Sequence, residues 1–138
     1  MKTVSSVIKR LIQQDPYYGL FLCGLNKEFS DKIETAGVCL DGINYKLLIN
    51  QEWWNGLLPD IRMGIIKHEL LHLVFYHVVD GEMWHALCPD HNMLNVAMDL
   101  EVQSYIDPQY RWSECTAEKI FAKYPNIPRE LGTKEYVK

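Results

Sequence analysis

The sequence predicts a compact α+β domain that is mostly helical, with one small antiparallel β-hairpin packed beside a central helix. Three observations carry this prediction. A chain of 138 residues with 48% apolar content is long enough to bury one sizeable core. Apolar residues recur at helical spacing in several segments. Two strand-like runs, AGVCL and INYKLLIN, flank the pair Asp41-Gly42, which is a strong hairpin signal.

In the N-terminal half, the first element is an amphipathic helix whose apolar residues share one face until Asp15-Pro16 ends it: Val4, Val7, Ile8, Leu11 and Ile12. The apolar stretch 16–30 is interpreted as a second short helix. Asn50 closes the second strand of the hairpin. After QEWWNGL, a Leu-Pro-Asp break predicts a helix that begins at Pro59 or Asp60, where the acidic residue suits the first turn.

This helix is expected to end near His77 or Val78 and to be covered on most sides. Only Arg62 and Lys67 offer obvious solvent-seeking side chains before its histidines. The stretch 78–91 has the Gly, Pro and Asp of a connection. Further helices are predicted over 91–106, over 116–124 with Thr116 as the cap, and from 133 onward. We therefore expect a single domain over residues 1–138, which a longer protein could contain as its N-terminal part.

Composition excludes several classes of protein. A net charge of −4, a pI near 5.7 and the lack of a basic stripe argue against nucleic acid as a partner. The apolar runs are too short and interrupted for a membrane span. Lys9 and Arg10 interrupt the first apolar pattern, so it is not a signal peptide. Four widely spaced cysteines without a CxxC pair predict free, mostly buried thiols in a cytoplasmic protein: Cys23, Cys39, Cys88 and Cys115.

The segment HELLH, residues 68–72, carries the strongest chemical signal. His68 and His72 are four residues apart, so their rings lie one helical turn apart on the same face. Two such imidazoles can bind one zinc ion at about 2.0–2.1 Å. Glu69 projects about 100° away and can take a proton from a metal-bound water. This is the HExxH arrangement of zinc metallopeptidases. The alternative is three surface or hydrogen-bonded core residues without a metal, which the apolar helix disfavours.

A catalytic zinc ion needs a third protein ligand and an open position for water. Asp99 is our first choice, because Asn92, Asn95 and Asp99 form a polar stripe on a helix that can pack against HELLH. The alternative for Asp99 is a hydrogen bond to a ligand histidine. His77 is the alternative ligand, although on a continuous helix it lies about 180° from His68. Glu101 lies about 200° from Asp99 and is expected to face elsewhere.

Other polar and aromatic residues have weaker claims. His85 and His91 lie in the predicted connection and are expected to be solvated. The strand Ile43–Asn50 is expected to be an edge strand that holds an extended peptide by backbone pairing. Nothing selects among the candidate donors to a tetrahedral oxyanion, which are Tyr76, Tyr105, Tyr110, His85 and Arg111. Packing is the expected role of the tryptophans, which are Trp53, Trp54, Trp84 and Trp112.

The order of these features resembles the metallopeptidase domain at the N-terminus of bacterial and phage proteins that carry a von Willebrand A-like domain. The resemblance rests on YKLLINQEWW, HELLHLVFYH, a loop with Trp84, and a helix reading LNVAMDLEVQ. It covers roughly residues 1 to 125. That family's second helix has Trp-Asn, Ala, Asp and an Ile-Asn pair. Three positions match here and three do not: Asn95, Ala97 and Asp99 match, Leu94 replaces tryptophan, and Val102-Gln103 replaces Ile-Asn.

The resemblance implies a zincin-like fold that binds zinc through His68 and His72, with Glu69 as the general base. It also implies functional roles for His77 and Asp99, and Asn95 and His77 are candidates for contacts with the metal ligands. The expected function is a zinc metallopeptidase acting on a peptide or protein, in a bacterial or phage-infected cytoplasm. One alternative is an inactive zinc-binding module of a larger assembly, with a von Willebrand A-like domain or an ATPase as partner. Another is a structural domain without metal.

Overall fold

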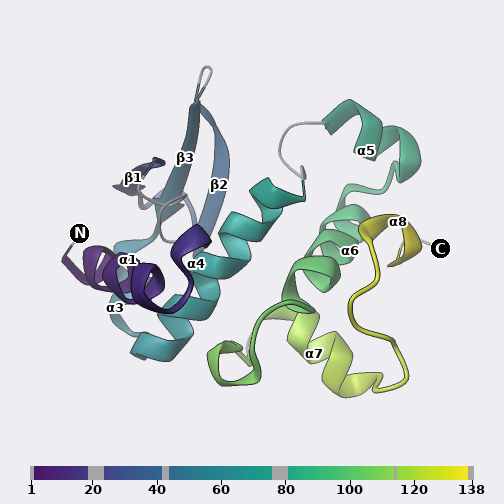
Figure 1. Ribbon diagram of the computed structural model, residues 1–138. Coiled ribbons are helices and arrows are strands. Elements are labelled where there is room, and N and C mark those ends of the chain that lie inside the picture. The colour runs from purple at the N-terminus through teal and green to yellow at the C-terminus, as the bar shows by residue number, and fades with distance from the viewer. Residues whose placement is uncertain (1, 19–23, 42–43, 76–80, 114, 137–138) are drawn as a thin grey trace.

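A computed structural model describes residues 2–18, 24–41, 44–75, 81–113 and 115–136. It contains helices along most of the chain and one three-stranded sheet, which lies at one side of the molecule (Figure 1). The elements in chain order are α1 (Lys2–Gln14), β1 (Asn26–Phe29), β2 (Ala36–Asp41), β3 (Asn44–Ile49), α3 (Gln51–Asn55), α4 (Pro59–Val74), α5 (Gly81–Leu87), α6 (His91–Gln103), the 3-10 helix η1 (Pro108–Tyr110), α7 (Thr116–Lys123) and α8 (Thr133–Tyr136). The predicted α+β class, with a small sheet beside mostly helical structure, is confirmed.

The sheet has the order β1-β3-β2, with β2 antiparallel and β1 parallel to β3. The predicted hairpin is confirmed, since Asp41 pairs with Asn44; its turn, 42–43, lies outside the described residues. Strand β3 was expected to be the edge strand over Ile43–Asn50, and this is wrong. It lies in the centre because β1, which the sequence did not predict, pairs with its second side. The outer strand beside α4 is β2.

Strand β1 also corrects the second helix expected over 16–30. Within 16–30, residues 16–18 are helical and Asn26–Phe29 form a strand, while 19–23 lie outside the described residues. The sequence NKEF is short and polar, so no apolar alternation marks it as a strand. Its backbone pairs with Lys46–Ile49 of β3, and tertiary pairing therefore decides its conformation.

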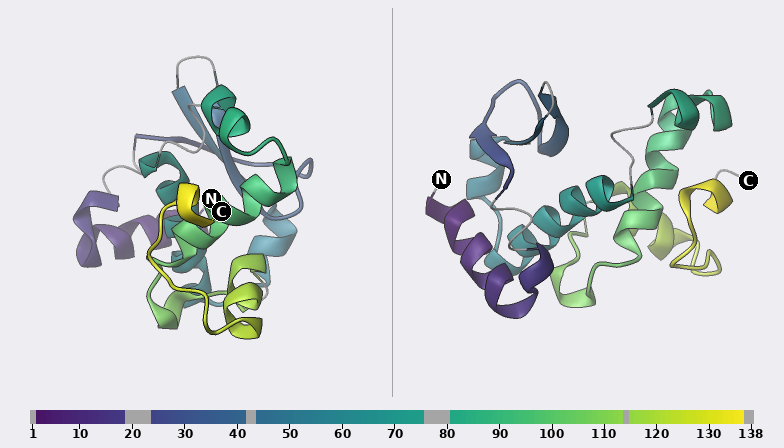
Figure 2. Two further views of the ribbon diagram at one scale, coloured as in Figure 1. Left: turned by 90° about the vertical axis from the view of Figure 1, so that its right-hand side faces the viewer. Right: turned by 45° about the horizontal axis from the view of Figure 1, so that its top comes forward.

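Helix α4 is the central element, as predicted. It contacts α1, β2, η1 and α6, and it runs between the sheet and α6 in Figure 1 and in the right-hand view of Figure 2. Lys67 is the exception to the prediction, because it is buried and not solvated. Its ammonium lies 3.1 Å from a carboxylate oxygen of Asp15 and over the rings of Tyr18 and Tyr110. An ion pair and two aromatic faces replace the water that the charge loses.

Helix α4 begins where the sequence predicts, but its described part ends earlier than predicted. Pro59 occupies the first turn, and Asp60 lies there too, paired with Arg10 at 2.6 Å. The described helix ends at Val74, three or four residues before the expected end. Phe75 leaves helical geometry with φ −89° and ψ 11° where its ring meets that of Tyr105 at 5.4 Å. Residues 76–80, which include His77, lie outside the described part of the chain.

Helices α5, α7 and α8 pack around α6, on the side away from the sheet, whereas η1 packs against α4 (Figure 1). Asp90 caps α6 by accepting hydrogen bonds from the amides of Asn92 and Met93. The predicted connection is wrong in part, because His85 lies within α5 and His91 opens α6; their side chains are not described. Helix α6 ends at Gln103 and not at 106. Helix α7 begins at the predicted residue, although Cys115 is its cap, and α8 is confirmed.

Two further features of the structure concern membrane spans and the cysteine thiols. Within the described ranges, no helix combines the length and apolar character that a bilayer crossing requires. The thiols of Cys39, Cys88 and Cys115 are free, and only that of Cys88 is buried. Cys23 lies outside the described residues.

Candidate metal centre

Two imidazole rings of α4 meet at the face of the helix that looks toward α6. The rings of His68 and His72 lie 4.8 Å apart between centroids, and their Nε2 atoms are 3.1 Å apart. This pairing follows from the sequence spacing, because residues four apart on a helix stack one turn above the other. The side chains are 14% and 15% exposed, so a cation can reach both nitrogen atoms without unfolding the helix.

The third member of the cluster comes from α6. One carboxylate oxygen of Asp99, Oδ1, lies 3.2 Å from Nε2 of His68 and 3.1 Å from Nε2 of His72. Packing of α4 against α6 brings these side chains together, as the polar stripe predicted. Among the described residues, they form the only group of three or more His, Cys, Asp or Glu side chains whose ligand atoms lie close enough together to hold one metal ion.

The size of this cluster fits a zinc ion. Its three ligand atoms lie 3.1–3.2 Å from one another. In a tetrahedral site with bonds of about 2.0–2.1 Å, neighbouring ligand atoms lie about 3.3 Å apart. Two imidazole nitrogens and one carboxylate oxygen are also a known donor set for catalytic zinc. Three ligands leave a fourth position for water.

Gln103 orients the first histidine, and the sequence reasoning missed this role. Its side-chain oxygen lies 2.7 Å from Nδ1 of His68, so an Nδ1–H group donates this bond and Nε2 faces the cluster. A group that orients a metal ligand normally contacts the ring nitrogen remote from the metal. Gln103 takes that place on His68, whereas Asp99 contacts Nε2 of both rings. This arrangement favours Asp99 as a ligand over Asp99 as a hydrogen-bonding partner of a ligand.

A pattern in the sequence could have identified Gln103. It follows Asp99 by four residues, so both side chains lie on the same face of α6. The residue is 3% exposed, and a buried amide side chain needs a hydrogen-bonding partner. The resemblance drew attention to this position only as a departure from the Ile-Asn pair.

Glu69 is buried, and it lines the same cavity as the two histidines. Burial raises the pKa of the Glu69 carboxyl to about 7; the charge of His68 opposes this rise, and the charge of Asp99 adds to it. A buried carboxyl group beside the candidate ligands can exchange a proton with a molecule in the cavity.

Without a metal, the surroundings of the cluster shift the pKa values of His68 and Asp99 in opposite directions. Burial lowers the pKa of His68, but the hydrogen bond to Asp99, the charges of Glu69 and Asp99 and the bond to Gln103 outweigh it and raise this pKa to about 9. The pKa of Asp99 moves the other way. Burial would raise it, but hydrogen bonds and charge from His68 and His72 hold it well below its usual value. The Asp99 carboxylate is therefore charged at neutral pH.

A cavity of about 650 Å³ opens onto the cluster. Its lining includes residues 35–38, which contain the start of β2. It also includes Trp53 and Trp112, whose rings meet edge to face at 5.4 Å. Trp54 and Trp84 are buried in the core. The cavity is large enough for several residues of an extended peptide.

The remaining candidate residues differ in where they lie relative to the cavity. Asn95 lines the cavity one turn before Asp99. Glu101 faces away, as predicted, and accepts a hydrogen bond from the Thr133 hydroxyl at 2.7 Å. His77 lies outside the described residues, so the structure does not place it.

Of the candidate oxyanion donors, Tyr110 lines the cavity but donates its hydroxyl to Gln14 at 2.9 Å. Arg111 binds the carbonyl oxygen of Ile106. Tyr105 is exposed. The other two candidates, Tyr76 and the side chain of His85, are not described.

Comparison with known proteins gives one result. Residues 2–115 match the model of a family described as "Putative metallopeptidase domain". The match includes α4, α6 and every residue of the cluster. No curated protein and no solved structure matches the chain.

Proposed function

The chain belongs to the family of putative metallopeptidase domains, and we propose that it is a zinc-dependent peptidase with Glu69 as its general base. The observation that carries this proposal is the meeting of His68, His72 and Asp99 at mutual distances of 3.1–3.2 Å. Glu69, whose side chain is buried, directly follows His68 in the chain.

His68, His72 and Asp99 would hold the zinc ion through Nε2, Nε2 and Oδ1. When bound there, zinc would lower the pKa of a water molecule and polarise a peptide carbonyl. Gln103 would keep His68 in the required tautomer, because its side-chain oxygen accepts a hydrogen bond from the Nδ1–H group. His77, which the sequence left as an alternative ligand, remains a candidate for a contact beside the site.

Glu69 would take the proton of the attacking water and pass it to the leaving nitrogen. Its carboxyl group lines the cavity next to the ligands and is shielded from bulk solvent. It is not a member of the metal-binding group, which leaves its oxygens available to a water molecule. A base that both accepts and donates needs this kind of position beside the reacting atoms.

The substrate would be an extended peptide segment lying along β2. This strand is at the edge of the sheet, and Ala36, Gly37 and Val38 line the cavity. An outer strand can pair with a peptide backbone. Trp53 and Trp112, which also line the cavity, would offer an apolar surface to side chains of the peptide.

The test compares the wild-type protein with Glu69→Gln on a peptide library prepared from a whole proteome, with cleavage read by mass spectrometry. We expect the variant to keep stoichiometric zinc and to lose cleavage by at least about 10²-fold, which is typical for removal of a general base. Glu101→Gln is the matched control, because its carboxylate faces Thr133 and not the cavity.

Two outcomes would contradict the proposal. Unchanged cleavage in Glu69→Gln would remove this residue from the mechanism. Stoichiometric zinc without any cleavage by the wild-type protein would leave a zinc-binding module of a larger assembly, which was the alternative drawn from the sequence. Metal analysis and anomalous diffraction at the zinc edge identify the ion and its ligands.

A further inference from the structure

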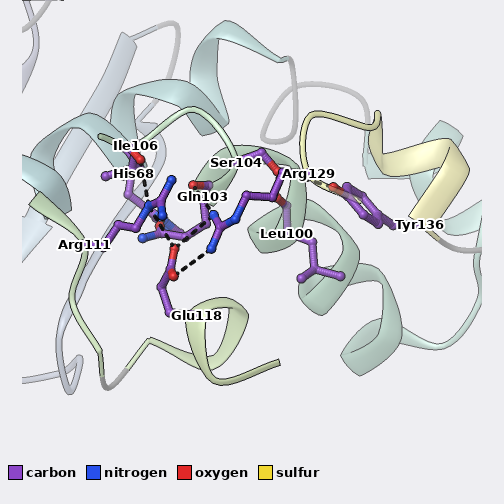
Figure 3. A network of polar contacts seen from close by, with 9 residues as sticks. All are labelled: His68, Leu100, Gln103, Ser104, Ile106, Arg111, Glu118, Arg129 and Tyr136. Atoms are coloured by element: carbon purple, nitrogen blue, oxygen red, sulfur yellow. Dashed lines mark hydrogen bonds and ion pairs between the residues drawn. The ribbon is translucent and has the colours of Figure 1, made fainter. Parts of the chain in front are cut away.

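A partly buried carboxylate holds two arginines together beside the end of α6 (Figure 3). Glu118 of α7 accepts hydrogen bonds from Arg129, at 3.0 Å for Nη2 to Oε2 and 3.4 Å for Nη1 to Oε1. Its Oε1 atom also lies 3.7 Å from Nε of Arg111. The Glu118 side chain is 12% exposed, so water screens these ion pairs less than it screens surface pairs. We call Arg111, Glu118 and Arg129 the clamp.

Both arginines of the clamp also bind the main chain where α6 ends. Nη1 of Arg129 donates to the carbonyl oxygen of Gln103 at 3.4 Å, and Nε of Arg111 donates to that of Ile106 at 2.9 Å. Carbonyl groups at the end of a helix lack partners within the helix, and positive charge is favourable there. The clamp therefore fixes the last turn of α6 from outside.

Gln103 connects this clamp to the metal centre. Its carbonyl oxygen binds Arg129, and its side-chain oxygen accepts the bond from Nδ1 of His68 at 2.7 Å. Figure 3 shows the chain of contacts from Glu118 through Arg129 and Gln103 to His68. Gln103 is thus held by Arg129 through its backbone and contacts His68 through its side chain.

We propose that Arg129, held by Glu118, is a positioning residue for the metal centre, and that it acts on His68 through Gln103. The inference rests on the proposed function in taking His68 as a zinc ligand. Its physical basis is that a shift of the Gln103 backbone would also move the side-chain amide group of Gln103. That group fixes the orientation of the His68 ring. A ligand held in place before the metal arrives binds it more tightly than one that must first be ordered.

Arg129 suits this task better than a lysine would. Its planar guanidinium bonds both oxygens of Glu118 and the Gln103 carbonyl oxygen at once. Its Cζ atom also lies over the Phe121 ring, 4.0 Å from the centroid. This contact helps to hold the plane of the guanidinium group. An ammonium group is a single point of charge and cannot keep the three bonds together.

The experiment compares Arg129→Lys with the matched control Arg62→Lys. Arg62 has the same kind of surroundings, because it donates to the carbonyl oxygens of Trp54 and Asn55 at the end of α3 and stacks over the Trp54 ring. It lines a separate small pocket beside α1. We expect zinc affinity to fall about tenfold in Arg129→Lys, the lower range for residues that orient a ligand. Affinity should stay within about twofold in the control.

A double-mutant cycle shows whether the effect runs through Gln103. In a Gln103→Leu background, Arg129→Lys should change zinc affinity by less than about twofold, because the contact that it acts through is already lost. A tenfold loss in both backgrounds, or an equal loss in Arg62→Lys, would overturn the inference. Glu118→Gln, which keeps the shape of the side chain, is the second variant if Arg129→Lys does not fold.

A second readout needs no metal. In the chelator-treated protein, the Nδ1–H resonance of His68 should be visible by NMR, since its bond to Gln103 protects it from exchange with water. It should remain visible in Arg62→Lys and be lost in Arg129→Lys; retention in Arg129→Lys would contradict the inference. Failure of the wild-type protein to bind zinc would contradict the proposed function alone, and the NMR result would then decide the inference.

Discussion

The Nε2 atom of His72 lies 3.1 Å from the Nε2 atom of His68. Two ring nitrogens at this distance suit one shared cation, so we predict that His72→Ala abolishes stoichiometric zinc binding. The free energy of unfolding should fall by about 4 kcal/mol when free zinc is at 1,000 times the dissociation constant. Chemical denaturation with and without EDTA measures this loss. EDTA should destabilise the wild-type protein and leave His72→Ala unchanged, and an equal effect on both would rule out this metal site.

The choice of third ligand gives a ranking of two variants. Asp99→Ala should weaken zinc binding more than His77→Ala does, because Oδ1 of Asp99 contacts both Nε2 atoms. The loss of a direct ligand is expected to exceed the 10–100-fold loss seen when an orienting residue is removed. Competition with a chromogenic chelator measures the two affinities. The reverse ranking would assign the third ligand to His77.

Gly64 allows α4 to approach η1 closely, and this gives a test of the fold around the site. A Cβ atom at this position would overlap the carbonyl oxygen of Tyr110 and lie 2.8 Å from its carbonyl carbon. These are backbone atoms, which cannot rotate away. Gly64→Ala should therefore lower the free energy of unfolding by about 1–3 kcal/mol, the range for overpacking.

Gly37→Ala is the control, since a Cβ atom there meets no heavy atom within 4 Å. Urea denaturation of both variants measures their free energies of unfolding. A Gly64→Ala protein as stable as the wild type would mean that η1 can move away from α4 at little cost.

The pKa of His68 predicts how the stability of the metal-free protein depends on pH. The folded protein raises this pKa from 6.5 to about 9, so its stabilising contribution is complete below pH 6.5 and is lost as the pH rises through 9. The free energy of unfolding should thus fall by an amount on the order of 1–2 kcal/mol between pH 7 and pH 9. Asp99→Asn removes the partner charge and should flatten this dependence. An equally steep fall in Asp99→Asn would assign the effect to other groups.

The local part of the site could be predicted from the sequence. The edge-to-face meeting of the His68 and His72 rings follows from the period of a helix. The polar stripe pointed to Asp99 because a carboxylate on an apolar helix face needs a partner. The hairpin was equally predictable, since Asp41-Gly42 joins two strand-like runs.

What the sequence could not predict depends on contacts between distant segments. Strand β1 forms because β3 offers it a free edge, and NKEF has no pattern of its own. Lys67 is buried because Asp15 and two tyrosine rings surround its charge. Gln103 gains its role only when α6 lies against α4, and the position of Arg129 depends in turn on Glu118.

The three candidate ligands come from two helices, and this has a consequence for the connection between them. His72 and Asp99 are 27 residues apart in the chain, so a cation held by both would act as a reversible cross-link that closes a loop. Closing such a loop restricts the unfolded chain, and the entropic cost grows only slowly with loop length. Residues inserted before or after α5 should therefore lower the stability of the zinc-bound protein only slightly, provided that α4 and α6 stay in register.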